Sequence, residues 1–153
     1  MRLKKLTIAV VYILIGIIIG SLGTMSWVGI KMAKTLLFLK EVELGKSGSM
    51  AWEGYNSGNS SIAIWALQQH LKNLDEYSEL DWPYKSVMEI EIIITHARLA
   101  KLYKDSGQTE EKNIHLREAL AISQSSDNTT FNSLTNEQSL FNKLDEFEYL
   151  YPR

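Results

Sequence analysis

Residues 99–120 of this chain read LAKLYKDSGQTEEKNIHLREAL and carry the pattern of two helices joined by a tight turn. Apolar side chains recur every three or four positions on both sides of a central Ser-Gly pair, which is typical of amphipathic helices. Gly107 is suited to end the first helix because glycine readily adopts the left-handed conformation found there. Thr109, followed by Glu110 and Glu111, predicts a cap and two carboxylates at the positive end of the second helix. The stretch therefore predicts a helical hairpin.

The rest of the body also favours helices. Residues 87–96 (VMEIEIIITH) contain β-branched side chains that would suit a strand, but the chain offers no second strand-like segment to pair with them. We therefore predict an all-α fold, with helices over about 50–56, 62–77, 83–105, 109–123 and 135–153 and a polar loop over 126–134. Residues 135–138 (TNEQ) predict a capping box for the last helix. Within 62–77, the side chains expected to face the core are Ile62, Trp65, Ala66, Leu67, Leu71 and Leu74.

Several positions of the 99–120 hairpin follow a known repeat. Leu99, Ala100 and Tyr103 fall on a Leu-Gly-x-x-Tyr pattern, Leu116 falls on a later Phe position, and Ala119 falls on a small position where paired helices approach. In these positions the hairpin resembles a tetratricopeptide (TPR) repeat. It departs from the family pattern at three positions: His96 replaces Trp, Lys112 replaces the first Ala, and Gln124 replaces Pro.

A fainter copy of the pattern lies earlier in the chain. Aligning Gly58 with Gly107 places Ala51 on the family Gly position, Ala63 on its Ala position and Leu67 on its Phe position, whereas Gly54 takes the Tyr position, with Tyr55 next to it. The two turn glycines are 49 residues apart, whereas the family repeat is about 34 residues long. The resemblance implies a TPR-like domain of antiparallel helical hairpins over residues 47–125, and the alternative is a generic helical bundle.

The resemblance also implies a binding surface, because TPR arrays present the first helix of each pair on a concave face that holds a peptide or helix. The implied protein-binding residues are Trp52, Tyr55, Asn56, Ala97, Lys101 and Lys104. Aromatic side chains beside lysines would suit a partly apolar, acidic peptide. Trp52 and Tyr55 have a second interpretation, as core residues that close the first hairpin.

The N-terminal segment predicts a membrane anchor. Residues 6–30 contain no charged side chain, and about 20 apolar residues in a helix cross the hydrocarbon layer of a bilayer. A basic tail (residues 1–5) precedes this predicted transmembrane helix, and a helical stalk (residues 31–46) with more lysines follows it. A flexible break is expected over residues 45–49 (GKSGS). The alternative is a cleaved signal peptide, which has a shorter apolar core and a small-x-small site.

The short tail favours a cytoplasmic N-terminus and a periplasmic C-terminal domain at a bacterial inner membrane, although basic residues flank the span on both sides. Within the span, Gly16, Gly20 and Thr24 place small residues at every fourth position. This spacing forms a flat strip where another helix can approach closely. The partner there could be a second copy or a different membrane protein.

Composition limits the remaining possibilities. All 18 acidic side chains lie in residues 41–153, together with 10 basic ones, and this charge disfavours nucleic acid as a partner. The chain contains no cysteine, its three histidines fall on three different predicted helices, and no phosphate loop or nucleophile motif occurs. We therefore expect no enzyme activity, no cofactor and no metal.

These patterns together predict a single-pass membrane protein that acts as an adaptor or scaffold for another protein. Two alternatives stay open. The chain could be an accessory or immunity-type subunit that binds a larger membrane protein through its transmembrane helix, or a homo-oligomeric structural protein.

Overall fold

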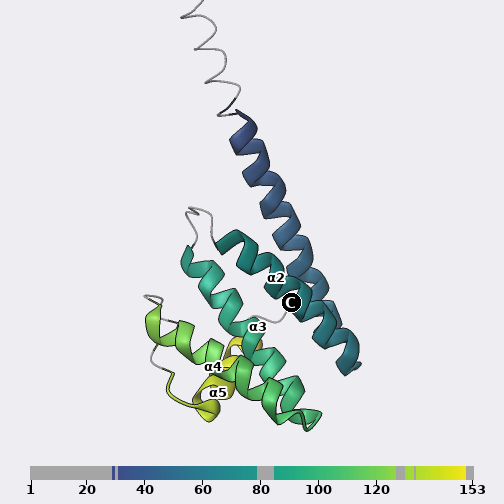
Figure 1. The fold of residues 1–153 in the computed structure, drawn as a ribbon, viewed down its shortest axis with the longest axis vertical. Helices are drawn as coiled ribbons and strands as arrows, with labels where there is room; N and C mark the ends of the chain where they lie inside the picture. Colours follow the sequence, from purple (N-terminus) through teal and green to yellow (C-terminus); the bar gives the residue numbers. More distant parts are fainter. Residues whose placement is uncertain (1–28, 30, 79–84, 127–129, 133, 151–153) are drawn as a thin grey trace, which may run out of the picture. The chain divides into compact units, whose positions relative to one another are not determined.

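The computed structural model describes residues 29, 31–78, 85–126, 130–132 and 134–150. In these ranges all regular structure is helical and no strand occurs, which confirms the all-α prediction (Figure 1). The segment 87–96 is helical despite its β-branched side chains. The chain divides into two compact units, residues 1–42 and 43–153, and each is described by itself.

In the first unit, residue 29 and residues 31–42 are helical. Large apolar side chains are exposed along this stretch: Met32, Leu36, Leu37, Phe38, Leu39 and Val42. None of the helices in the described part of the chain combines the length and the apolar character needed to cross a bilayer. The predicted span over 6–30 lies outside the described residues except for Gly29, so the span stays a prediction.

The second unit begins with a helix that covers residues 43–55. The flexible break predicted over 45–49 is wrong, because these residues are helical. Two glycines in this stretch each cost a helix about 1 kcal/mol relative to alanine. Contacts with the next helix offset this cost: the Ser47 hydroxyl lies 2.9 Å from Nδ1 of His70, and Gly48 packs against the same imidazole.

Residues 43–55 and α2 (Ser60–Ser78) form an antiparallel hairpin. Its pairing runs from Gly54 beside Ala66 at the turn to Glu43, which accepts a hydrogen bond from the Tyr77 hydroxyl at 2.5 Å. The turn contains Gly58 at φ +74°. Asn59, rather than a serine, caps α2, since its Oδ1 accepts hydrogen bonds from the amides of residues 61 and 62.

The central helix is α3 (Lys85–Asp105), which contacts α2, α4 (Thr109–Ser125) and α5 (Glu137–Leu150) (Figure 1). Every residue from Ile92 to Ala100 is buried, as expected for a helix that is covered on several sides. Gly107 ends α3 in the left-handed conformation, at φ +74°. The amide of Gln108 donates to the carbonyl of Tyr103 at 2.9 Å, and the amide of Gly107 donates to the carbonyl of Lys104 at 3.1 Å. This pair of bonds is a Schellman motif, so the predicted turn is confirmed.

Two details of helix capping differ from prediction. Thr109 is the first residue of α4 rather than its cap; Gln108 holds the cap position without a side-chain hydrogen bond. The box predicted over 135–138 is shifted by one residue. The Asn136 side chain accepts a hydrogen bond from the amide of Ser139 at 2.9 Å, and the Ser139 hydroxyl accepts one from the amide of Asn136 at 3.2 Å.

The core of the second unit forms two apolar clusters. One joins α3 to the helix of residues 43–55 and to α2 through Ala51, Leu67, Leu99 and Tyr103. The other joins α3 to α4, α5 and the loop between them through Ile93, Ile94, Ala97, Ala119, Phe131, Leu140 and Leu144. Ile62 and Trp65 do not face the core as predicted: they are 50% and 55% exposed, because Ala63 and His70 occupy the inward positions of α2.

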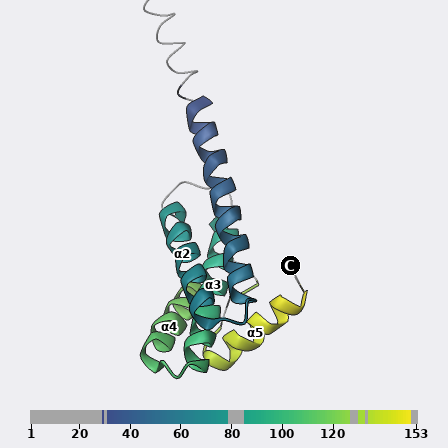
Figure 2. The ribbon, with the colours of Figure 1, turned by 90° about the vertical axis from the view of Figure 1, so that its right-hand side faces the viewer.

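The loop that precedes α5 is anchored to α4. Phe131 is fully buried, and its carbonyl accepts a hydrogen bond from the Ser123 hydroxyl. The same hydroxyl accepts a bond from the amide of Leu134 at 3.3 Å. Helix α5 then packs against α3 (Figure 2). The loop predicted as polar therefore contains a buried aromatic anchor, and α5 begins after it at Glu137.

Candidate functional site

The predicted groove residues of α3 lie on the face that α5 covers. Ala97 is 0% exposed and belongs to the same apolar cluster as Leu140 and Leu144 of α5. Lys101 and Lys104 flank this contact, and both form ion pairs with α5. A residue with no exposed surface cannot touch a partner, so Ala97 is closed to any other protein while α5 is in place. The chain itself therefore occupies this part of the predicted groove.

Three cations of α3 pair with three acids of α5. Nε of Arg98 lies 2.8 Å from Oε1 of Glu148, Nζ of Lys101 lies 2.8 Å from Oδ1 of Asp145, and Nζ of Lys104 lies 2.8 Å from Oε1 of Glu137. The partners run in opposite directions along the two helices, and α5 crosses α3 obliquely (Figure 2). We call the surface formed by Ala97, Arg98, Lys101 and Lys104, together with Trp52 and Tyr55, the α3 face.

The two aromatic residues of the α3 face surround Arg98. Its guanidinium carbon lies 4.8 Å from the ring centre of Trp52 and 5.0 Å from that of Tyr55. Both rings are half-buried, so they neither belong fully to the core nor stand free in solvent. Asn56 is exposed, and its side-chain amide donates to the carbonyl of Trp52 at 2.8 Å. Five of the six predicted residues therefore lie around Arg98 or against α5. The sixth, Asn56, bonds to the backbone of its own helix.

The charges of this face perturb the ionisable groups near it. Burial raises the pKa of the Tyr55 hydroxyl, and the nearby Glu148 carboxylate adds to the rise. Burial is the largest influence on Lys101 and would lower its pKa, but the hydrogen bond to Asp145, together with the nearby charges of Tyr55, Asp145 and Glu148, raises the pKa overall. Hydrogen bonds from Lys104 and Lys112 lower the pKa of the Glu137 carboxyl. The charged forms of Lys101 and Glu137 are therefore the stable ones in the folded domain.

Sequence reasoning missed Arg98 and the role of α5. A signal for Arg98 was present, because Arg98, Lys101 and Lys104 are spaced three residues apart and share one side of a helix. The complementary acids are spaced less regularly, at positions 137, 145 and 148, and lie more than 30 residues away. No local pattern connects the two sets.

The histidines form two separate polar contacts. Nδ1 of His96 lies 2.9 Å from Nδ1 of His115, whose ring stacks on Tyr103 with centres 5.5 Å apart. Burial, and then the neighbouring His115, lower the pKa of His96 to about 4, and burial also lowers the pKa of His115. Two neutral imidazoles can share one proton across this contact. Within the described ranges, no group of three or more His, Asp or Glu side chains is arranged to hold a metal ion.

The third histidine, His70, lies between Ser47 and Glu91, in the order of a nucleophile, a base and an acid. Its Nδ1 is 2.9 Å from the Ser47 hydroxyl, but its Nε2 is 4.0 Å from Glu91, which is beyond hydrogen-bond range. The Ser47 hydroxyl also donates to the carbonyl of Leu44 at 3.0 Å. These contacts join the helix of residues 43–55 to α2 and hold the first hairpin together.

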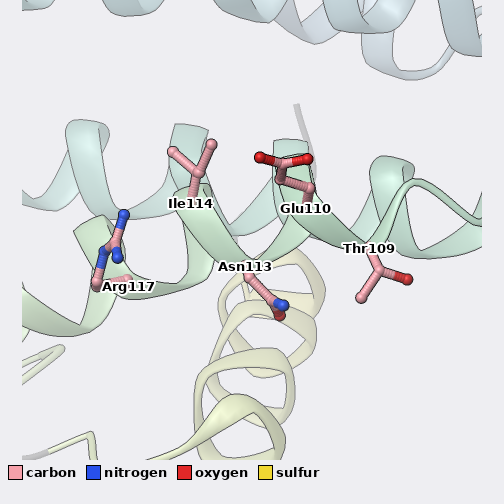
Figure 3. Close-up of a pocket in the computed structure, with 5 residues that line it drawn as sticks. All are labelled: Thr109, Glu110, Asn113, Ile114 and Arg117. Carbon is pink, nitrogen blue, oxygen red and sulfur yellow. The ribbon is translucent and has the colours of Figure 1, made fainter.

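A surface depression on α4 is lined by Thr109, Glu110, Asn113, Ile114 and Arg117. Figure 3 shows that Glu110 and Ile114 point to one side of the helix, whereas Thr109 and Asn113 point to the other. These side chains do not converge on a common point, so they do not form a binding site for a small molecule.

The predicted packing strip of Gly16, Gly20 and Thr24 lies outside the described residues. Comparisons with protein families, with curated proteins and with solved structures give no match for this chain.

Proposed function

We propose that this protein is a membrane-anchored adaptor whose helical domain binds a partly apolar, acidic segment of another protein on the α3 face. The observation that carries the proposal is the set of ion pairs between Arg98, Lys101 and Lys104 and the acids of α5. A face that accepts one acidic amphipathic helix has the charge and shape to accept another.

Two further observations support the TPR-like part of the proposal. Small residues lie at two positions where paired repeat helices approach, because Ala51 on the family Gly position and Ala63 on the family Ala position are both buried. The turn of the second hairpin contains Gly107 in the left-handed conformation. Small residues at these contacts and a tight turn are consistent with the repeat pattern.

The anchor is supported by sequence. Residues 6–30 are uncharged and are flanked by basic residues, and exposed apolar side chains continue over residues 32–42. We place the protein in a bacterial inner membrane with its domain in the periplasm. A protease or a labelling reagent that is added to the periplasmic side, and cannot cross the membrane, should reach the domain if this orientation is right.

Crosslinking in native membranes tests the adaptor function. We expect wild-type protein to capture a distinct protein, and Lys101→Glu to reduce this capture strongly. Lys72→Glu is the matched control, because Lys72 is an exposed lysine of α2 that pairs only weakly, at 3.8 Å, with Glu76 of the same helix. Equal capture by all three chains would contradict the proposal.

Substitution of the membrane segment separates the alternatives. If Gly16→Leu/Gly20→Leu abolishes capture and Lys101→Glu does not, the partner is held through the membrane helix. The size of the captured band then distinguishes an accessory subunit from a homo-oligomer.

A further inference from the structure

We propose that α5 is an exchangeable occupant of the α3 face, and that the partner is an acidic amphipathic helix of another protein that takes its place. This inference rests on the proposed function and adds the chemistry of the partner and the way it enters. The structure shows the face in its closed state, with α5 bound in the same chain.

The contacts of α5 define what the partner helix must contain. The acids that pair with α3 and the apolar residues that enter the core fall on one stripe of α5: Glu137, Leu140, Leu144, Asp145 and Glu148. This corresponds to positions i, i+3, i+7, i+8 and i+11, which share one side of a helix. A partner helix with this pattern can form the same ion pairs and fill the same apolar contact.

The described residues before α5 are attached to α4 as well as to α5. The Ser123 hydroxyl of α4 bonds to Phe131 and Leu134, and the Phe131 ring lies 5.8 Å from the ring of Phe147 in α5. The bonds to Ser123 are separate from the ion pairs with α3, so they can persist when α5 leaves the α3 face. Two of those ion pairs are open to solvent: the side chains of Lys101 and Asp145 are 35% and 60% exposed, and those of Lys104 and Glu137 are 52% and 29% exposed. Exposed pairs of this kind hold a helix weakly.

The α3 face is larger than the surface that α5 covers. Trp52 and Tyr55 remain half-exposed beside Arg98, and the last described residues of α5, Tyr149 and Leu150, are themselves exposed. A longer helix could extend past the end of α5 and cover the two rings. The α5 helix of a second copy would form only the contacts that α5 already forms, so replacing one by the other adds no contact. A longer helix of another protein adds the contacts with the two rings.

A peptide-binding experiment on the full chain in detergent tests the inference. The probe is a fluorescent peptide with the sequence of residues 135–150, which carries the required pattern. The wild-type chain should bind it weakly, because the tethered α5 has a high effective concentration at the face. Glu148→Lys weakens the tethered α5, and we expect it to increase peptide affinity by about tenfold or more.

The matched control is Glu146→Lys, which makes the same substitution two residues away, where Glu146 pairs with Lys143 of α5 itself. It should leave peptide affinity at the wild-type value. Adding Lys101→Glu to Glu148→Lys should abolish binding, and a peptide carrying Asp145→Lys should restore it.

If Glu148→Lys fails to fold, the full-length Glu148→Gln chain is the second variant, because it removes the charge of the ion pair without placing a cation beside Arg98, and tighter peptide binding than wild type supports the inference. A folded Glu148→Lys chain that binds no peptide overturns it. Dimerisation of that chain through α5 also overturns it, because the occupant is then a second copy. If membrane capture still depends on Lys101 while no peptide binds, the proposed function stands and only the exchange of α5 is wrong.

Discussion

Arg98 joins three parts of the domain through one side chain. Its guanidinium contacts the rings of Trp52 and Tyr55 and pairs with Glu148, so it links the first hairpin, the central helix and α5. Arginine suits this position because its planar group can stack on aromatic rings while its edge donates to a carboxylate. Lysine carries the same charge but cannot form both contacts in this geometry.

We therefore expect Arg98→Lys to lower the free energy of unfolding by about 1–2 kcal/mol, which is the scale of a lost stacking contact and a weakened, partly buried ion pair. Denaturant titration of the full chain checks this value. Lys72→Arg, on the exposed side of α2, is the control and should change stability by less than about 0.5 kcal/mol. A neutral Arg98→Lys would show that Arg98 does not join the three parts.

The buried histidine contact predicts a dependence of stability on pH. Burial and His115 lower the pKa of His96 to about 4 in the folded state, while an unfolded histidine has a pKa of about 6.5. The unfolded chain therefore binds more protons between these values, so stability is complete above about pH 6.5 and falls as the pH drops toward 4. Burial also lowers the pKa of His115, and the Glu118 carboxylate opposes part of that second shift.

Replacing His96 tests this dependence. His96→Gln should be less stable than wild type at pH 8, but its stability should fall less between pH 6.5 and pH 4. Denaturant titrations at four or five pH values give the free energy of unfolding of each chain as a function of pH. Subtracting one curve from the other cancels the contribution of the carboxylates, which both chains contain. Equal slopes for the two chains would contradict the assignment.

At the scale of helices, sequence periodicity predicted most of the elements. The helices near 62–77, 83–105 and 109–123 follow from regular apolar spacing, and the turn at Gly107 follows from the special conformation of glycine. The break over 45–49 was predicted from two glycines and two serines, and it was wrong. The low helix propensity of these residues is overridden there by contacts with α2, such as the one between Ser47 and His70, which are 23 residues apart in the sequence.

Replacing two glycines of this first helix by alanine should change stability in opposite directions. Gly45 has open space around it, so Gly45→Ala should stabilise the helix by roughly 0.5–1 kcal/mol, the usual gain in a helix interior. At Gly54 the same substitution places a Cβ atom 2.7 Å from that of Ala66. Because real contacts are never this short, the hairpin must separate, and Gly54→Ala should destabilise the domain by about 1–3 kcal/mol.

Thermal and denaturant unfolding of the two variants measures this difference in sign. Gly54→Ala/Ala66→Gly should recover part of the loss, because it returns the space to the opposite helix. If Gly54→Ala stabilises the domain as much as Gly45→Ala does, the two helices do not approach closely at this point.

At the scale of the whole domain, α5 is positioned by ion pairs with α3 together with apolar side chains that enter the core. Residues 41–153 carry 18 acidic and 10 basic side chains, yet the α3 face gathers Arg98, Lys101 and Lys104 on one surface. The sequence alone predicted an aromatic and lysine-containing face suited to an acidic segment. It could not predict that the chain supplies such a segment itself, because pairing between residues 98–104 and 137–148 depends on tertiary packing and not on local pattern.

A charge-swap experiment tests most directly whether the α3 face serves binding as well as stability. Lys101→Glu places two acids opposite each other and should lower both the stability of the domain and its capture of a partner in native membranes. In Lys101→Glu/Asp145→Lys the internal ion pair is restored with reversed signs, so stability should return to within about 0.5 kcal/mol of wild type. We predict that partner capture stays lost in the double variant, because the face now repels an acidic helix. Recovery of capture together with stability would contradict the account and would assign the α3 face to folding alone.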